Sequence, residues 1–192
     1  MKVTKGDAGY LTARKKKQIL IALVEFAIVG LLLAAGWIKT GSRMNIMTVI
    51  AVLGCLPACD ALVSVIMIFP HPSIPCEKAE EIAKKTPLLT VAYDMVITSR
   101  ETSAMPVDCI VISDNTICGY VHSSKVGAEA TALYIKKMLV KNHYGKASVK
   151  LFPDYHAFLT RAETMNQNAQ IEQPDGKEKE ETMKALILSI SL

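Results

Sequence analysis

Residues 19–38 read ILIALVEFAIVGLLLAAGWI, a stretch of twenty residues in which Glu25 is the single charged side chain. An α-helix rises about 1.5 Å per residue, so this stretch spans roughly 30 Å, the thickness of the hydrocarbon core of a bilayer. A second apolar stretch, residues 46–69, is interrupted only by Pro57 and Asp60. Because the short polar segment 39–45 separates the two, the sequence predicts an antiparallel hairpin of two transmembrane helices with 39–45 as an external loop.

A cleaved signal peptide is the alternative interpretation of the first stretch, since basic residues precede it. The apolar region of a signal peptide is about 7–15 residues long, and here a second apolar stretch follows at once. We therefore expect residues 19–38 to be retained as a transmembrane helix.

Basic residues near the ends of the two stretches predict the orientation of the hairpin. Residues 1–18 form a basic leader with six Lys or Arg and one Asp, and three lysines lie between residues 78 and 85, after the second stretch. Four of the leader residues are consecutive: Arg14, Lys15, Lys16 and Lys17. Because Lys and Arg flanking a span favour the cytoplasmic side, we expect a multi-pass protein of the cell membrane with both termini in the cytoplasm. The leader cluster can also attract anionic lipid.

Glu25 and Asp60 are the costliest residues of the predicted hairpin, at roughly 2.5–3.5 kcal/mol for a charge at the bilayer centre. They lie at similar depths, about 9 Å and 13–14 Å from the cytoplasmic ends, and so could meet and share a proton. One interpretation is a neutral, hydrogen-bonded pair that fixes helix packing or association between copies. The alternative is a proton- or metal-responsive unit that also uses Cys55 and Cys59, on either side of a helix kink at Pro57. We favour the first, because two helices alone cannot enclose an ion pathway.

The sequence predicts that residues 76–192 form a cytoplasmic domain of mixed helices and strands, an α/β (α+β) fold. The segment has 14 basic and 15 acidic residues and is long enough to bury a core. Periodicity and turn residues predict a helix at 77–85, strands at 88–98, 107–112 and 116–122, a helix at 126–142, a strand at 147–152, a helix at 154–168 capped by Asp154, a polar linker at 169–182 and a terminal strand at 186–192. The predicted order is therefore α-β-β-β-α-β-α-β.

The Asp114-Asn115 pair between the second and third strands is typical of a tight hairpin turn. With these two residues as the loop, Ile110 lies opposite Gly119 and Asp108 opposite Val121. Alternation then puts Asp108 on the same face of the sheet as Ile110.

The order of elements in residues 77–152 and the tripeptide Pro106-Val107-Asp108 resemble the restriction-endonuclease-like superfamily, with its PD-(D/E)xK motif, and within it the NERD and Mrr-like branches. The resemblance implies a restriction-endonuclease-like fold with Asp108 as a ligand of catalytic Mg²⁺. The second acid and the lysine of that motif would fall on Gly119 and Val121, which cannot bind a metal or polarise a phosphate. We therefore expect an inactive relative, and a membrane-tethered, metal-dependent nuclease is the alternative.

Other chemistry has little support in the sequence. No His or Cys spacing is typical of zinc, and Cys109 and Cys118 are predicted to be diagonal on adjacent strands, too strained for a disulfide. Cys118 and His122 are too far apart along one strand for a nucleophile and base. The nearly neutral charge of the domain also argues against nucleic acid as a partner. We expect a membrane-anchored, non-catalytic interaction domain without cofactor, whose partners are the lipid bilayer, a cytoplasmic protein and, through the helices, other copies of the chain.

Overall fold

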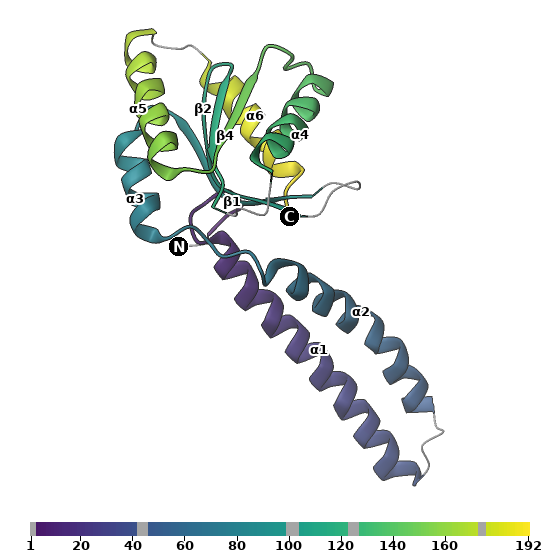
Figure 1. Cartoon of the computed structure of the whole chain (residues 1–192). Coiled ribbons are helices and arrows are strands. Elements are labelled where there is room, and N and C mark those ends of the chain that lie inside the picture. Colours follow the sequence, from purple (N-terminus) through teal and green to yellow (C-terminus); the bar gives the residue numbers. More distant parts are fainter. Residues whose placement is uncertain (1–2, 42–45, 99–103, 123–126, 173–175) are drawn as a thin grey trace. The chain divides into compact units, whose positions relative to one another are not determined.

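The computed structural model of the chain describes residues 3–41, 46–98, 104–122, 127–172 and 176–192. Its elements are, in chain order, α1 (Tyr10–Thr40), α2 (Ile46–Ile68), α3 (Cys76–Lys85), β1 (Thr90–Ile97), β2 (Met105–Ser113), β3 (Thr116–Tyr120), α4 (Ala128–Lys141), β4 (Ser148–Phe152), α5 (Tyr155–Glu172) and α6 (Lys177–Ser189). The chain divides into two compact units (Figure 1): a helical hairpin, Leu11–Pro72, and an α/β unit formed by Ser73–Leu192 together with the N-terminal segment through Tyr10.

The hairpin contains both predicted spans, and each of its helices is long and apolar enough to cross a membrane. Small buried residues line its interior, with Ala22 on α1 and Ala51 and Ala58 seven residues apart on α2. Small side chains allow helix backbones to approach closely, and a Cβ placed on Gly54 would lie 3.4 Å from Val29 Cγ2. Residues 42–45 of the predicted external loop lie outside the described residues.

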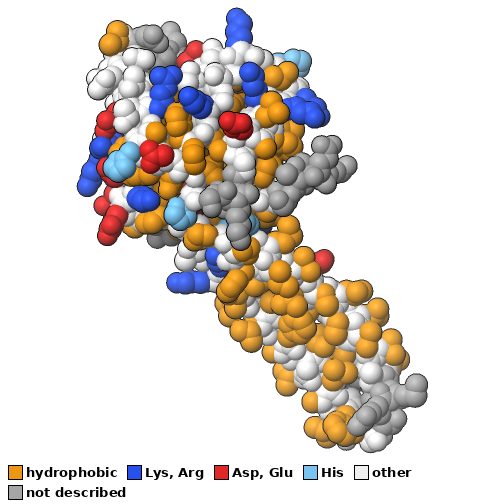
Figure 2. Space-filling view, in the orientation of Figure 1, with side chains coloured by type: hydrophobic (Ala, Val, Ile, Leu, Met, Phe, Trp, Pro, Cys, Tyr) orange, Lys and Arg blue, Asp and Glu red, His pale blue; other side chains and the backbone are white. Residues whose placement is uncertain are grey.

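The outer surface of the hairpin is apolar. Only 17% of the most apolar stretch of each helix is buried. Figure 2 shows hydrophobic side chains over most of this unit, whereas charged side chains are scattered over the α/β unit. A core helix of a globular protein would bury most of such a stretch, so the exposure favours a lipid-facing role over a core role.

The α/β unit is built on one four-stranded sheet in the order β1-β2-β3-β4. β1, β2 and β3 form an antiparallel meander, and β4 is parallel to β3 because α4 connects the two. The predicted turn is confirmed: Ser113 pairs with Thr116 across Asp114 and Asn115, and Ile110 pairs with Gly119 as expected.

Helices cover both faces of the sheet (Figure 1). On one face α4 and α6 contribute Ile135, Leu139, Met183 and Ile187 to a core with β-strand residues that include Ile110, Ile112 and Ile117. On the other face α3 and α5 contribute Ala79, Ile82, Phe158, Leu159, Ala162 and Met165 to a second core with Cys109, Val111, Cys118 and Tyr120. The prediction of a mixed α/β domain is confirmed at this level.

The predicted terminal strand at 186–192 is wrong. Residues up to Ser189 belong to α6, and Ser191 alone makes an isolated bridge, to Ile97. Glu180, Met183 and Ile187 are buried at helical spacing on one face of α6, whereas the short apolar run LILSISL taken alone fits a strand equally well. In the described part of the chain the order is therefore α-β-β-β-α-β-α-α after the hairpin.

The helix predicted at 154–168 is present and longer than expected. Asp154 Oδ2 accepts the Ala157 N–H at 3.0 Å, as an N-cap should. α5 continues to Glu172 and α6 begins at Lys177, so most of the predicted linker 169–182 is helical.

Candidate functional site

The pairing of β1 and β2 is interrupted where Asp94 lies opposite Asp108. Tyr93 pairs with Cys109 and Met95 with Val107, but no pair is formed between them. Asp94 has a φ of 53°, a left-handed conformation that Asp and Asn tolerate better than most residues.

Both strands change face at this interruption. On β2, Cys109 packs in the core under α3 and α5, whereas Val107 packs in the core under α4 and α6, which also holds Ile110. The alternation of side chains along the strand is therefore broken at Asp108. The face of Asp108 therefore does not follow from that of Ile110 by simple alternation, and the shared face of these two residues stays a prediction.

Asp94 is a buried carboxylate, only 2% exposed. Its Oδ1 accepts the N–H of Ile74 at 2.8 Å. Its Oδ2 is buried and has no hydrogen-bond partner among the described residues. A buried carboxylate with one unused oxygen is costly, which marks this position for something more than packing.

Tyr93, the residue before Asp94, binds the segment that precedes α1. The Tyr93 N–H donates to the Gly6 carbonyl oxygen at 2.8 Å, and Gly6 has a φ of 96° that favours glycine. Gly6 precedes α1 in the chain, and Ile74 follows α2. The segments on both sides of the hairpin are therefore attached to two successive residues of β1.

Asp108 lies beside this attachment point and is half-buried. A carboxylate oxygen of Asp108 accepts the N–H of His122. Burial raises the pKa of Asp108, and the Asp94 carboxylate raises that pKa further. The hydrogen bond from His122 and the positive charge of Lys78 act in the opposite direction. Burial, with a smaller contribution from Asp94, thus makes Asp108 easier to protonate than an ordinary exposed aspartate.

A lysine and aromatic rings lie near Asp94 and Asp108. Lys78 Nζ lies 5.4 Å from the ring centre of Tyr120 and 4.7 Å from that of Tyr155, within range of cation–π attraction. The Tyr120 hydroxyl lies 3.2 Å from His122 Nδ1. The Tyr155 hydroxyl donates to Glu81 at 2.7 Å, and burial together with this bond raises the pKa of Tyr155.

The strand next to Asp108 does not supply the remaining nuclease groups. A Cβ on Gly119 would lie 2.4 Å from a Leu151 side-chain atom and 3.1 Å from the Cys109 carbonyl oxygen, so an acid does not fit there. Val121 is 1% exposed. The described residues contain no group of three or more His, Cys, Asp or Glu side chains that could hold a metal ion.

The cysteines of the sheet are free thiols. Val111 pairs with Cys118, which leaves Cys109 diagonal to it as expected. Burial raises the pKa of Cys118 to about 12 and raises that of Cys109 well above its ordinary value. Neither thiol is suited to nucleophilic chemistry, because the thiolate is the reactive form.

Glu25 and Asp60, the two acidic residues predicted to meet in the hairpin, differ in exposure. Glu25 is half-buried and its Oε2 has no partner among the described residues, whereas Asp60 is exposed. In the described part of the chain no hydrogen bond joins the two. Pro57 lies inside α2, next to the free thiols of Cys55 and Cys59.

The predicted basic cluster lies in the second turn of α1, which begins at Tyr10. Lys15 Nζ donates to the Phe69 carbonyl oxygen at 3.0 Å and lies 5.9 Å from the Phe69 ring, so this lysine closes the open end of the hairpin. Lys16 and Lys17 are exposed, and Arg14 is half-buried.

Sequence reasoning missed Asp94, although a signal was present. Asp94 is a charged residue in the middle of the apolar strand TVAYDMVI. Such a residue has to be paired, or else marks a break in the strand. Comparison of the chain with protein-family models, with curated proteins and with solved structures found no match.

Proposed function

We propose that the hairpin anchors this chain in the cell membrane and that the α/β unit acts on the cytoplasmic side by binding a protein partner, without chemistry of its own. The observation that carries the anchoring is the outward exposure of two long apolar helices. Transfer of such helices from water to lipid is favourable, because most of their backbone groups bond within the helices and their side chains are apolar.

The attachment of both flanks supports placing both termini on one side of the membrane. Gly6 and Ile74 are bonded within the same compact unit, so the chain enters and leaves the hairpin from that unit. The basic residues of the leader favour the cytoplasmic side for it.

Membrane anchoring and orientation can be tested by fractionation and thiol labelling of the full chain. We expect the chain to stay in the membrane pellet through carbonate extraction. An impermeant maleimide should label the variant Lys39→Cys, made in a Cys76→Ser background, in intact cells. It should label native Cys76, which is exposed on α3, only after permeabilisation. Extraction by carbonate would contradict the anchoring, and labelling of Cys76 in intact cells would contradict the orientation.

We also propose that copies of the chain associate through the hairpin. Asp60 is exposed on α2, and an isolated charge facing lipid costs roughly 2.5–3.5 kcal/mol. Contact between copies would remove the Asp60 carboxyl from lipid and provide a hydrogen-bond partner. Cross-linking in native membranes should give dimers or larger species that Asp60→Leu reduces and Asp60→Asn retains. Equal cross-linking in all three proteins would contradict this contact.

A metal-dependent nuclease is the second candidate function. It is favoured by the order α3-β1-β2-β3-α4-β4 and by the half-buried Asp108 within β2. The purified full chain, incubated with DNA or RNA and Mg²⁺ or Mn²⁺, should cleave neither. Cleavage that Asp108→Asn abolishes would establish the nuclease in place of the non-catalytic domain.

A further inference from the structure

The two edges of the sheet differ in whether other segments of the chain bond to them. The outer edge of β1 is covered by both ends of the chain: Tyr93 N–H donates to Gly6, Leu192 N–H donates to the Val96 carbonyl at 2.8 Å, and Thr98 N–H donates to the Ile190 carbonyl at 3.2 Å. The outer edge of β4 carries no hydrogen bond in the part of the chain that the structure describes.

The main-chain groups available on β4 belong to Val149 and Leu151. Ser148 N–H donates to the Asn115 carbonyl at 2.7 Å, and the Phe152 carbonyl accepts from Val121 N–H at 3.0 Å. Both bonds point toward β3. Because the N–H and C=O of one residue lie on the same side of a strand and successive residues alternate, the groups of Val149 and Leu151 point to the open edge.

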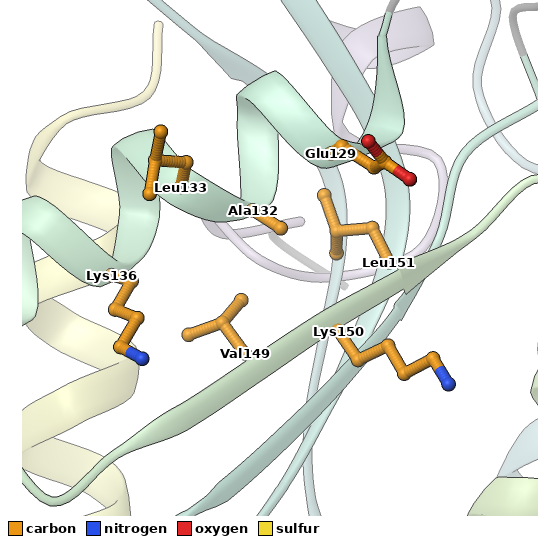
Figure 3. A pocket seen from close by; sticks show the side chains of 7 residues that line it. All are labelled: Glu129, Ala132, Leu133, Lys136, Val149, Lys150 and Leu151. Carbon is orange, nitrogen blue, oxygen red and sulfur yellow. The ribbon is translucent and has the colours of Figure 1, made fainter.

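A groove of about 320 Å³ runs between this edge and α4. Its lining residues are Glu129, Ala132, Leu133, Lys136, Val149, Lys150 and Leu151. In Figure 3 the side chains of Val149 and Leu151 rise from β4 toward α4, and Lys136 reaches back from α4 toward the strand. Leu133 is 69% exposed, so the groove has an apolar wall that the chain itself leaves open.

The charge around the groove is one-sided. Five exposed lysines lie on α4, on β4 and on the connection between them: Lys136, Lys137, Lys141, Lys146 and Lys150. Within the described residues none of these five forms an ion pair. Glu129 is the single acidic residue among the groove's lining side chains. An occupant with acidic side chains would therefore be favoured.

We propose that an extended, acidic segment of a partner protein adds to the sheet along the outer edge of β4. Its main chain bonds to Val149 and Leu151, and its apolar side chains pack against Leu133 and Leu151. Because successive side chains of a strand alternate, its carboxylates point to the other face of the sheet, where Lys150 lies (Figure 3). A second copy of this chain fits less well, because pairing β4 with β4 would bring lysines together, and like charges across paired strands are destabilising. This inference rests on the proposed function, whose binding surface it names.

The test uses the full chain in lipid nanodiscs and a fluorescent peptide of alternating valine and glutamate about as long as β4. We expect saturable binding that weakens as salt is added, and no comparable binding of a valine–lysine peptide. Lys150→Glu should raise the Kd by about fivefold or more, whereas Lys137→Glu, on α4 outside the groove, should have a smaller effect.

A backbone variant separates strand addition from simple charge attraction. Val149→Pro removes an N–H that points to the open edge and leaves the bonds to β3 in place, so the Kd should rise by about tenfold or more. In the unmodified chain, the peptide should also slow hydrogen exchange of the Val149 and Leu151 amides, a measurement that does not depend on the folding of the variant.

Three outcomes would overturn the inference: peptide binding without protection of the two amides, equal effects of Lys150→Glu and Lys137→Glu, or protection of these amides by self-association in the absence of peptide. Each can occur in a chain that remains membrane-anchored. Failure of this inference is therefore distinct from failure of the proposed function, which carbonate extraction tests.

Discussion

At the scale of single residues, Asp94 meets two requirements at once: it adopts a positive φ, and its side chain accepts a hydrogen bond from Ile74. Its φ of 53° is costly for most residues, and its Oδ1 is the acceptor for a buried N–H of Ile74. A β-strand interior does not ordinarily select Asp, so both demands explain why the residue stands here. Substitutions can separate them.

We expect Asp94→Ala to lower the free energy of unfolding of the α/β unit by about 2–4 kcal/mol. The change leaves the buried Ile74 N–H without an acceptor and puts a residue that disfavours positive φ at this position. Asp94→Asn keeps a side-chain acceptor and tolerates the positive φ. Asp94→Gly tolerates the positive φ but has no acceptor. Hydrogen exchange of the Ile74 amide in the full chain should rank the variants Asn, Gly, Ala from slowest to fastest. A glycine variant as protected as the asparagine variant would show that the bond contributes nothing.

Asp108 predicts a dependence of stability on pH. Because its pKa is raised in the folded chain, the folded state holds this proton more tightly than the unfolded state. The resulting stabilisation is present below the ordinary pKa of Asp, about 4, and is lost as pH rises through the raised value. Asp108→Asn stays neutral and can still accept from His122. It should therefore be more stable than the wild type at pH 7 and equal to it near pH 4.

Thermal unfolding of the full chain over this pH range measures the difference. Glu129→Gln is the matched control, since Glu129 is exposed and forms no ion pair among the described residues. A variant that gains stability equally at both pH values, or a control that behaves as Asp108→Asn does, would contradict a raised pKa at Asp108.

At the scale of elements, α6 is fixed to the sheet by a buried acid. Glu180 is 2% exposed and accepts from the Thr90 hydroxyl at 2.8 Å and the Asp114 N–H at 2.7 Å. Lys179 reinforces this contact through Asp114, and the lysine lowers the pKa of that carboxyl. The first turn of α6 is thereby joined to the loop between β2 and β3.

Loss of this acid should loosen α6. We expect Glu180→Ala to lower the free energy of unfolding by about 2–4 kcal/mol, because the buried Thr90 hydroxyl and the partly buried Asp114 N–H both lose their acceptor. Glu180→Gln should cost less, since it retains one acceptor, and Glu178→Ala, exposed in the same turn, should cost little. Circular dichroism during thermal unfolding checks the order, and a Glu178→Ala effect as large as that of Glu180→Ala would contradict it.

The sequence predicted those elements whose signals are local. The Asp114-Asn115 loop set the register of β2 and β3, and Asp154 capped α5 as expected, because turns and caps depend on a few adjacent residues. Helix α6 was not predictable in this way, since Glu180 finds its partners on β1 and in the loop between β2 and β3. The same holds for the site: Asp108 was identified, but the position of Asp94 opposite it and the attachment of Gly6 depend on contacts between remote segments.

At the scale of the whole molecule, both flanks of the hairpin belong to one folded unit. The two ends of the hairpin therefore have to lie on the same side of a membrane for that unit to form. Replacing Arg14, Lys16 and Lys17 by Gln removes three of the charges on which the proposed orientation depends and leaves Lys15, which bonds to Phe69. We expect a fraction of these molecules to insert in an altered orientation.

In molecules with an altered orientation, the segments before α1 and after α2 should still lie on the same side of the membrane as each other. Tags at the two ends, probed by protease in sealed vesicles, should be accessible both together or not at all in chains whose α/β unit resists digestion. Molecules with one tag on each side cannot join Gly6 to Tyr93 and should be degraded, because the edge of β1 is then uncovered. Replacing Lys136, Lys137 and Lys141 by Gln removes as much charge far from the spans in sequence and should leave orientation unchanged. A protease-resistant α/β unit in molecules with one tag on each side would contradict the dependence of this fold on both flanks.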